Sequence, residues 1–199
     1  MVSTAYPRPL SRPYLARVTR AGFAMDGIDL SERTVVDALK VGGASRSCRP
    51  RQAQRLRNHV AILRRIHTTA RRGEPLAAGT IVRWYTSVAC GLSTAHLDVP
   101  SLARLDRVAR RINSPPQNLR PALEELAALH ADVLADPIVP SFNGILARLL
   151  LTFHLTRCGL PPVLFQPDTD RGLPPHGPTW LRRLLELITQ SLDALLAEP

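Results

Sequence analysis

Three residues in the C-terminal half of the chain have the types and spacing of an anion site: Asn143, Gly144 and Arg148. An Asn-Gly pair favours a turn and a helix start, and the first turn of a helix attracts negative charge through its free N–H groups. An arginine one turn further on adds a positive charge to the same corner. The pattern predicts a site for an anion such as a phosphate. The alternative is structural: a simple turn, with Arg148 in an interhelical ion pair with Asp26 or Glu124.

A second polar turn, Asp26–Gly27, lies near the N-terminus. It precedes a helix that we expect from about Glu32 to Lys40, for which Ser31 offers an N-cap. Glycine after an acidic residue is typical of a tight turn, so Asp26 is interpreted first as a turn or capping residue.

The sequence has no strong metal or disulfide pattern. Its three cysteines, Cys48, Cys90 and Cys158, lie far apart without CxxC spacing, which indicates neither a zinc site nor a disulfide framework. His130 and His154 make a two-histidine metal site conceivable, but isolated histidines in helical segments are more often core or surface residues. We therefore predict no metal site.

The elements that must position these residues are predicted to be helices. Apolar residues make up 45% of the chain and aromatic residues only 5%, and runs of Leu and Ala are interrupted by Arg and Glu. The segment that holds Arg148 is apolar almost all round, which is typical of the centre of a helical bundle. A short helical stretch at 14–23 and about seven helices are expected, at residues 32–40, 49–73, 77–91, 101–112, 122–136, 144–158 and 179–198. Residues 166–178 are predicted to form a loop.

The formal net charge of +10 comes almost wholly from arginine, since Lys40 is the only lysine. It gives the surface a positive field. The strongly basic, amphipathic helix Arg49–Arg72 could follow the phosphate backbone of a nucleic acid. It contains no stacking aromatics and no helix-turn-helix signature, so a solvated basic face is favoured over a nucleic-acid site.

The length of 199 residues is about that of one domain. Three prolines in residues 1–13 predict an extended N-terminal arm, followed by a single helical domain at 14–199. No apolar run reaches the roughly 18 to 20 residues of a membrane span, and the N-terminus lacks a hydrophobic signal core, so we expect a cytoplasmic protein without membrane contact. The final helix is more widely apolar than an exposed helix requires, and could dock on the bundle or on a second copy as a homodimer.

The segment from Asn143 to Phe165 resembles the end of the Fic (Fido) family signature, HPFx(D/E)GNGRxxR, and the helix that follows it. Counted without a gap, Asn143, Gly144 and Arg148 match the asparagine, the second glycine and the second arginine. In that family the loop and the following helix N-terminus hold nucleotide phosphates. The resemblance thus implies an all-α, Fic-like helical bundle with a nucleotide site at these residues.

A weaker resemblance links residues 22–39 to the N-terminal inhibitory segment of many Fic proteins. Asp26–Gly27 takes the place of the Glu-Gly pair of that segment, and Gly22 stands where a serine or threonine belongs. The resemblance implies that Asp26 is an inhibitory carboxylate directed at Arg148, although its side chain is one methylene shorter than glutamate.

The signature is degenerate. Pro137 stands at the position of the catalytic histidine, with Asp136 before it, and no histidine occurs from Ala131 to Phe153. Proline cannot serve as the general base that activates a target hydroxyl. Three further signature residues are replaced: the metal-holding acid by Ser141, a loop glycine by Phe142 and the first arginine by Ile145.

The commonest activity of the Fic family is transfer of AMP from ATP onto a protein hydroxyl. The first hypothesis is a degenerate Fic-like protein without that activity and without a catalytic residue, which acts by binding or regulating a protein partner. The second is an active transferase that uses ATP and Mg²⁺, with a site rebuilt around Asn143, Gly144 and Arg148 and with Asp136 or His154 as base. The third is a basic helical nucleic-acid-binding protein.

Overall fold

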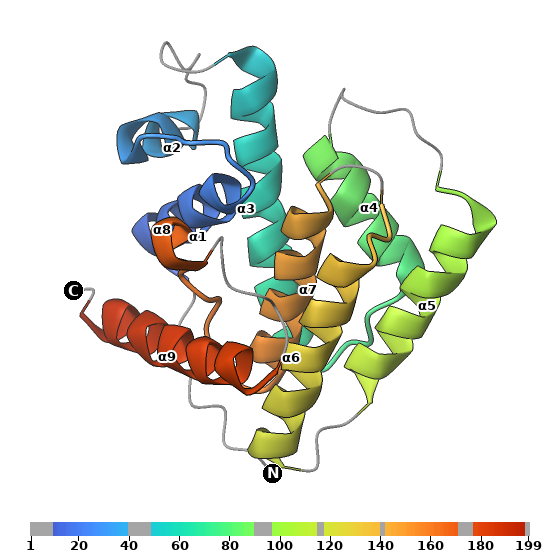
Figure 1. Ribbon diagram of the computed structural model, residues 1–199. Coiled ribbons are helices and arrows are strands. Elements are labelled where there is room, and N and C mark those ends of the chain that lie inside the picture. Colours follow the sequence, from blue (N-terminus) through green and yellow to red (C-terminus); the bar gives the residue numbers. More distant parts are fainter. Residues whose placement is uncertain are drawn as a thin grey trace.

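The computed structural model describes residues 10–39, 49–89, 97–114, 118–139, 142–170 and 177–197. Within these ranges the chain forms nine helices and no strand, which confirms the all-helical prediction (Figure 1). The helices are α1 (Arg12–Met25), α2 (Glu32–Ala38), α3 (Pro50–Arg71), α4 (Ala78–Ala89), α5 (Val99–Asn113), α6 (Leu119–Ala135), α7 (Asn143–Arg157), α8 (Pro167–Asp170) and α9 (Gly177–Leu196). Residues 1–9 of the predicted arm lie outside the described residues, as do Lys40, Cys48, Cys90 and Ser141.

Helices α1 and α8 differ from the sequence pattern in an informative way. Helix α1 begins at Arg12, before the predicted end of the arm, because Ser11 Oγ accepts the N–H of Tyr14 and Pro13 is tolerated in a first turn. Helix α8 is a single turn inside the predicted loop 166–178. Its Asp170 accepts the N–H of Gln166 and pairs with Arg183 on α9, so a tertiary contact stabilises a turn that has no periodic signal.

Helices α1 and α7 end at glycine residues in a left-handed conformation. Gly27 follows α1 with a φ of 79°, a left-handed conformation that costs other residues more than glycine. The N–H of Gly27 bonds the carbonyl of Ala24, and that of Ile28 bonds Phe23, which closes the helix end in a Schellman motif. Gly159 ends α7 in the same way.

Helix α7 lies at the centre of the bundle, as its all-round apolar sequence predicts. Every residue from Ile145 to Thr156 is buried, and the helix packs mainly against α3 and α6, which flank it in Figure 1. Cys158, just past its end, is a buried thiol. The site predicted at the start of α7 is therefore held by the most deeply packed element of the protein.

The outer helices bury one face each, and these buried faces are mainly apolar. On α3 they include Leu56, Val60, Leu63, Ile66 and His67, and on α4 they include Ile81, Trp84, Tyr85 and Val88. Helix α9 docks on α6 through a second cluster that contains Trp180, Leu184 and Leu187. Among the described residues, no helix is long and apolar enough to cross a membrane.

Candidate functional site

The link between α6 and α7 contains one residue in a conformation that usually requires glycine. Phe142 has a φ of 58° and a ψ of 24°, and among the described residues it is the sole non-glycine residue with positive φ. Its ring is half-buried, and the guanidinium carbon of Arg55 lies 5.1 Å from the ring centre. Phe142 therefore adopts a left-handed turn conformation that glycine takes at lower cost.

The side chain of Asn143 holds the preceding loop through two hydrogen bonds. It is the first residue of α7 and makes no side-chain cap on that helix. Its Oδ1 accepts the N–H of Ile138 at 3.0 Å, and its Nδ2 donates to the carbonyl of Val133 at 2.6 Å. Both ends of the amide are therefore engaged by backbone groups of the end of α6 and the loop after it.

Arg148 is a buried cation that already has a carboxylate partner. Its Nη2 lies 2.7 Å from Asp26 Oδ2 and donates to the carbonyl of Gly22 at 2.8 Å. The Arg148 side chain is 9% exposed and that of Asp26 is 21% exposed. The sequence suggests Asp26 or Glu124 as the ion-pair partner of Arg148, and Asp26 is the partner observed. Glu124 pairs instead with Arg120 on the surface.

Gly144 provides the space into which the carboxylate fits. A Cβ on residue 144 would meet Asp26 Oδ1 at 2.5 Å and Arg148 Nη1 at 3.1 Å. The structure thus brings Asp26, Gly144 and Arg148 into one corner, with Asn143 beside them at the start of α7. A carboxylate of the chain itself lies where the sequence pattern predicts an anion.

Two neutral histidines flank Arg148. Burial, together with the positive charge of Arg148, lowers the pKa of His59 from 6.5 to about 3 and that of His130 to about 3. Thr19 Oγ1 and His59 Nδ1 are hydrogen-bonded at 3.1 Å. Burial also lowers the pKa of Arg148, and the negative charge of Asp26 offsets part of this shift. The corner therefore holds a single strong cation with one compensating carboxylate.

His130 lies in an aromatic stack that the sequence pattern did not indicate. Its ring is nearly parallel to that of Trp180, with centroids 5.1 Å apart, and stacks less closely on Phe165 at 6.3 Å. Neither ring nitrogen of His130 has a hydrogen-bond partner among the described residues. The three rings come from α6, from the segment after α7 and from α9, so only the folded chain could reveal the stack.

The residues considered as substitute bases lie elsewhere. Asp136 ends α6 with a side chain that is 77% exposed and paired with Arg104 at 2.6 Å, and Arg104 also donates to the carbonyl of the exposed Pro137. His154 lies six residues beyond Arg148, about 9 Å along α7. Burial lowers its pKa to about 4. Within the described part of the chain, no group of three or more His, Cys, Asp or Glu could hold a metal ion.

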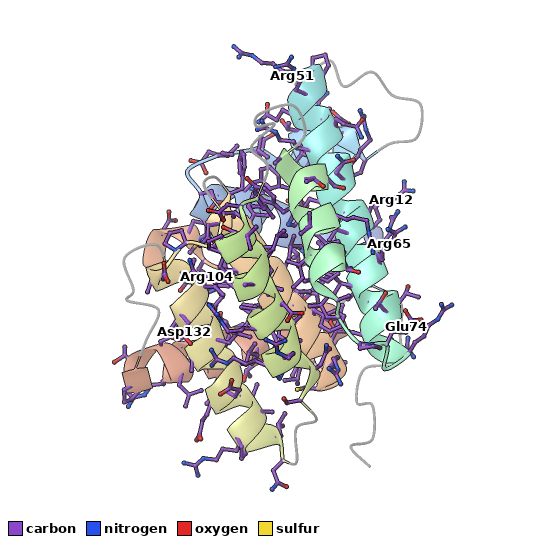
Figure 2. The ribbon with its side chains drawn as sticks, turned by 90° about the vertical axis from the view of Figure 1, so that its right-hand side faces the viewer. Arg12, Arg51, Arg65, Glu74, Arg104 and Asp132 are labelled. Carbon is purple, nitrogen blue, oxygen red and sulfur yellow. The ribbon has the colours of Figure 1, made fainter. Side chains whose placement is uncertain are left out.

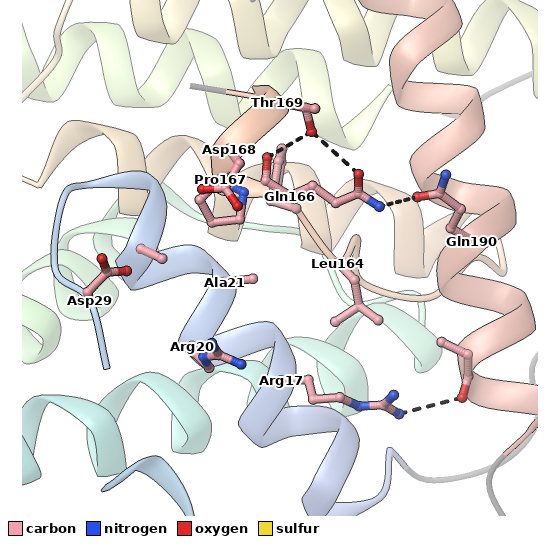
Figure 3. Close-up of a pocket in the computed structure, with 13 residues that line it drawn as sticks. Arg17, Arg20, Ala21, Asp29, Leu164, Gln166, Pro167, Asp168, Thr169 and Gln190 are labelled. Carbon is pink, nitrogen blue, oxygen red and sulfur yellow. Dashed lines mark hydrogen bonds between the residues drawn. The ribbon is translucent and has the colours of Figure 1, made fainter. Parts of the chain in front are cut away.

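A groove of about 730 Å³ adjoins the corner (Figure 3). It lies between α1, residues 164–169 and α9, and its wall includes Phe165, whose ring centre is 6.0 Å from the guanidinium carbon of Arg148. Gln166 Nε2 donates to Gln190 Oε1 at 2.9 Å along one side, and Arg17 reaches a carbonyl of α9. Sequence reasoning missed these groove residues because isolated glutamines carry no periodic or motif signal.

Comparison with known proteins gives a likeness of fold. No protein-family profile matches the chain, and no curated protein matches its sequence. The crystal structure of a Fic family protein from Desulfovibrio desulfuricans G20 superposes with a TM-score of 0.60 at 15% identity. The match covers 92% of this chain but 66% of that protein, so the chain spans less than two thirds of its length. The chain has the all-helical fold of a Fic family protein.

Proposed function

We propose that this chain is a degenerate Fic-like protein that does not transfer AMP and acts by binding or regulating another protein. The observation that carries the proposal is the ion pair between Asp26 and Arg148 over Gly144. A nucleotide phosphate directed at Arg148 would have to displace a carboxylate that is already paired and partly buried. This contact supports the inhibitory assignment of Asp26–Gly27.

Three replaced residues support the loss of transfer chemistry. Pro137, at the position of the catalytic histidine, offers no group that accepts a proton. Ile145, at the position of the first arginine, is 1% exposed and packs in the core, so it neither neutralises nor contacts a phosphate in solvent. Phe142 places a bulky ring where a glycine would leave room for a ligand.

The first test is a calorimetric titration with ATP and Mg²⁺ of the wild-type protein, Asp26→Asn and Arg148→Met. We expect no saturable heat for the wild type or for Arg148→Met, because the first has its cation occupied and the second lacks it. Asp26→Asn leaves Arg148 uncompensated, so weak, saturable binding is expected. Asp193→Asn, at an exposed position of α9 that does not line the groove, is the matched control and should behave as the wild type.

Each protein is then incubated with labelled ATP and a cell extract, and label on protein is measured. The proposal predicts none above background for any of the four proteins. Saturable ATP binding by the wild type together with transfer of label, both lost in Arg148→Met, would establish the active alternative. That result would direct attention to Asp136 and His154 as candidate bases.

A further inference from the structure

Positive charge is concentrated in a groove between α3 and α4. Its residues are distant in sequence from both Asp26 and Arg148. It has a volume of about 500 Å³ and is formed by the C-terminal half of α3, the turn after it and the start of α4. We call it the α3–α4 groove; it is lined by Arg64, Arg65, Thr68, Thr69, Arg72, Glu74, Pro75, Thr80 and Arg83. Figure 2 shows Arg65 on this half of α3 and Glu74 in the turn that follows the helix, with Arg51 at the opposite end of α3.

The arginines of the α3–α4 groove have few acidic partners, although Arg83 Nη2 donates to Thr80 Oγ1 at 2.8 Å. Within the described residues, no ion pair joins Arg64, Arg65 or Arg83 to an acidic side chain. Arg72 has one acidic neighbour, Glu74 at 3.5 Å, and both side chains are at least half exposed, which makes the pair weak. Four guanidinium groups therefore face one carboxylate.

This contrasts with the arginines that bind other parts of the chain. Arg111 contacts Glu125 and Asp132, Arg148 contacts Asp26, and Arg183 contacts Asp170, all at 2.8 Å or less. Placing several guanidinium groups around one hollow with a single carboxylate among them costs electrostatic repulsion. A ligand with several negative charges would remove that repulsion.

The lining of the groove selects a phosphate backbone as that ligand. Guanidinium groups bind phosphate oxygens through paired N–H donors. The Thr80 hydroxyl, which accepts from Arg83, keeps its own proton to donate, whereas the Thr68 hydroxyl already donates to the carbonyl of Arg64. Helix α4 begins at Ala78, beside Pro75 and Thr80, so the positive end of its dipole also lies at the groove. From Arg64 to Arg72, the residue that caps the end of α3, the distance along the helix axis is about 12 Å, which equals the rise of three to four nucleotides on one strand.

The types of side chain that the groove lining lacks also narrow the choice of ligand. Apart from Pro75 it consists of arginine, threonine and glutamate, without an aromatic or aliphatic side chain. A base has nothing to stack on, and a lipid surface has no apolar group to bury. We infer that the α3–α4 groove binds the sugar-phosphate backbone of a nucleic acid, without reading its sequence. This inference does not depend on the proposed function.

The test compares two variants that lose the same charge, using a short fluorescent DNA duplex of arbitrary sequence. The groove variant combines Arg64→Gln, Arg65→Gln, Arg72→Gln and Arg83→Gln. The control variant combines Arg51→Gln, Arg107→Gln, Arg120→Gln and Arg182→Gln, at exposed positions of α3, α5, α6 and α9. Circular dichroism and thermal unfolding verify that both remain folded, which is expected because all eight side chains are at the surface.

Binding is measured by anisotropy between ~50 and ~200 mM salt. Four phosphate contacts give a slope of log affinity against log salt of about −3 to −4, which the groove variant should lose together with about tenfold or more in affinity. The control variant should keep most of the slope. Equal losses in the two variants, or no binding by the wild type at ~50 mM salt, would overturn the inference. So would binding to phosphatidylserine vesicles in place of DNA.

Discussion

The carboxylate of Asp26 lies against the backbone of Gly144, so that a Cβ at residue 144 would come within 2.5 Å of Asp26 Oδ1. The contact joins the end of α1 to the second residue of α7 and places the carboxylate beside Arg148. A side chain larger than hydrogen at residue 144 must move the carboxylate, the helix or both. This steric relationship can be tested without knowing a ligand.

Gly144→Ala should lower the free energy of unfolding by about 1–3 kcal/mol, the usual cost of forcing an extra methyl group into a packed contact. Gly79→Ala is a matched control, since Gly79 is also the second residue of its helix and its Cβ would meet nothing closer than Arg83 Nη1 at 4.0 Å. There alanine should stabilise by up to about 1 kcal/mol. Urea denaturation measures both; equal effects would contradict the contact.

The ion pair between Asp26 and Arg148 should show strong coupling in a double-mutant cycle. Asp26→Asn leaves Arg148 without its compensating charge, and Arg148→Met leaves the carboxylate without its partner. Each should cost about 2–4 kcal/mol of unfolding free energy, and the double variant clearly less than their sum. Arg111→Met is the comparison: it removes two ion pairs between partly exposed side chains and should cost about 1 kcal/mol of unfolding free energy. Additive effects at Asp26 and Arg148 would show that the pair contributes nothing.

The two hydrogen bonds of the Asn143 side chain should stabilise the loop before α7 and slow hydrogen exchange there. Asn143→Ala removes a hydrogen bond to Ile138 N–H and one to the carbonyl of Val133, at a cost of about 1–3 kcal/mol. Asn143→Asp still accepts from Ile138 but cannot donate to Val133, so it separates the two bonds. Hydrogen exchange at the Ile138 amide should be fast in the alanine variant and remain slow in the aspartate variant. Unchanged exchange in both would show that other contacts protect this amide.

The buried histidines should make the protein sensitive to acid. The pKa values of His59 and His130 are lowered to about 3 and that of His154 to about 4, against 6.5 in the unfolded chain. At pH values between the folded-state and the unfolded-state pKa, the unfolded state binds more protons than the folded state. Stability should therefore be complete above about pH 6.5 and should fall as the pH falls towards 3–4, by up to about 1.4 kcal/mol per pH unit for each histidine.

His130→Phe isolates one of these contributions, because it keeps a flat ring against Trp180 and removes the titrating group. Urea denaturation from about pH 7.5 down to about pH 4.5 should show a slope lower than that of the wild type by about one proton. At the upper end the variant should be at least as stable, since it also removes two ring nitrogens that lack partners among the described residues. An unchanged slope would show that His130 is protonated in the folded state.

The helices could be predicted because their signals are local. Apolar residues recur with the helical period on α3, α4 and α6, and Gly27, Gly73 and Gly159 end helices through left-handed turns. Helix α8 could not be predicted, since its turn is held by the contact between Asp170 and Arg183. The aromatic stack on His130 also depends on elements that meet only in the bundle.

By itself, the sequence determined an all-helical chain with an apolar central helix, and it placed Asn143, Gly144 and Arg148 at the start of that helix. The tertiary structure decided what each of them contacts: Arg148 binds Asp26, 122 residues away, and Asn143 binds the backbone of the preceding loop. Helical period fixes which residues share a face, but the packing of helices distant in sequence fixes which charges and hydrogen-bonding groups meet there.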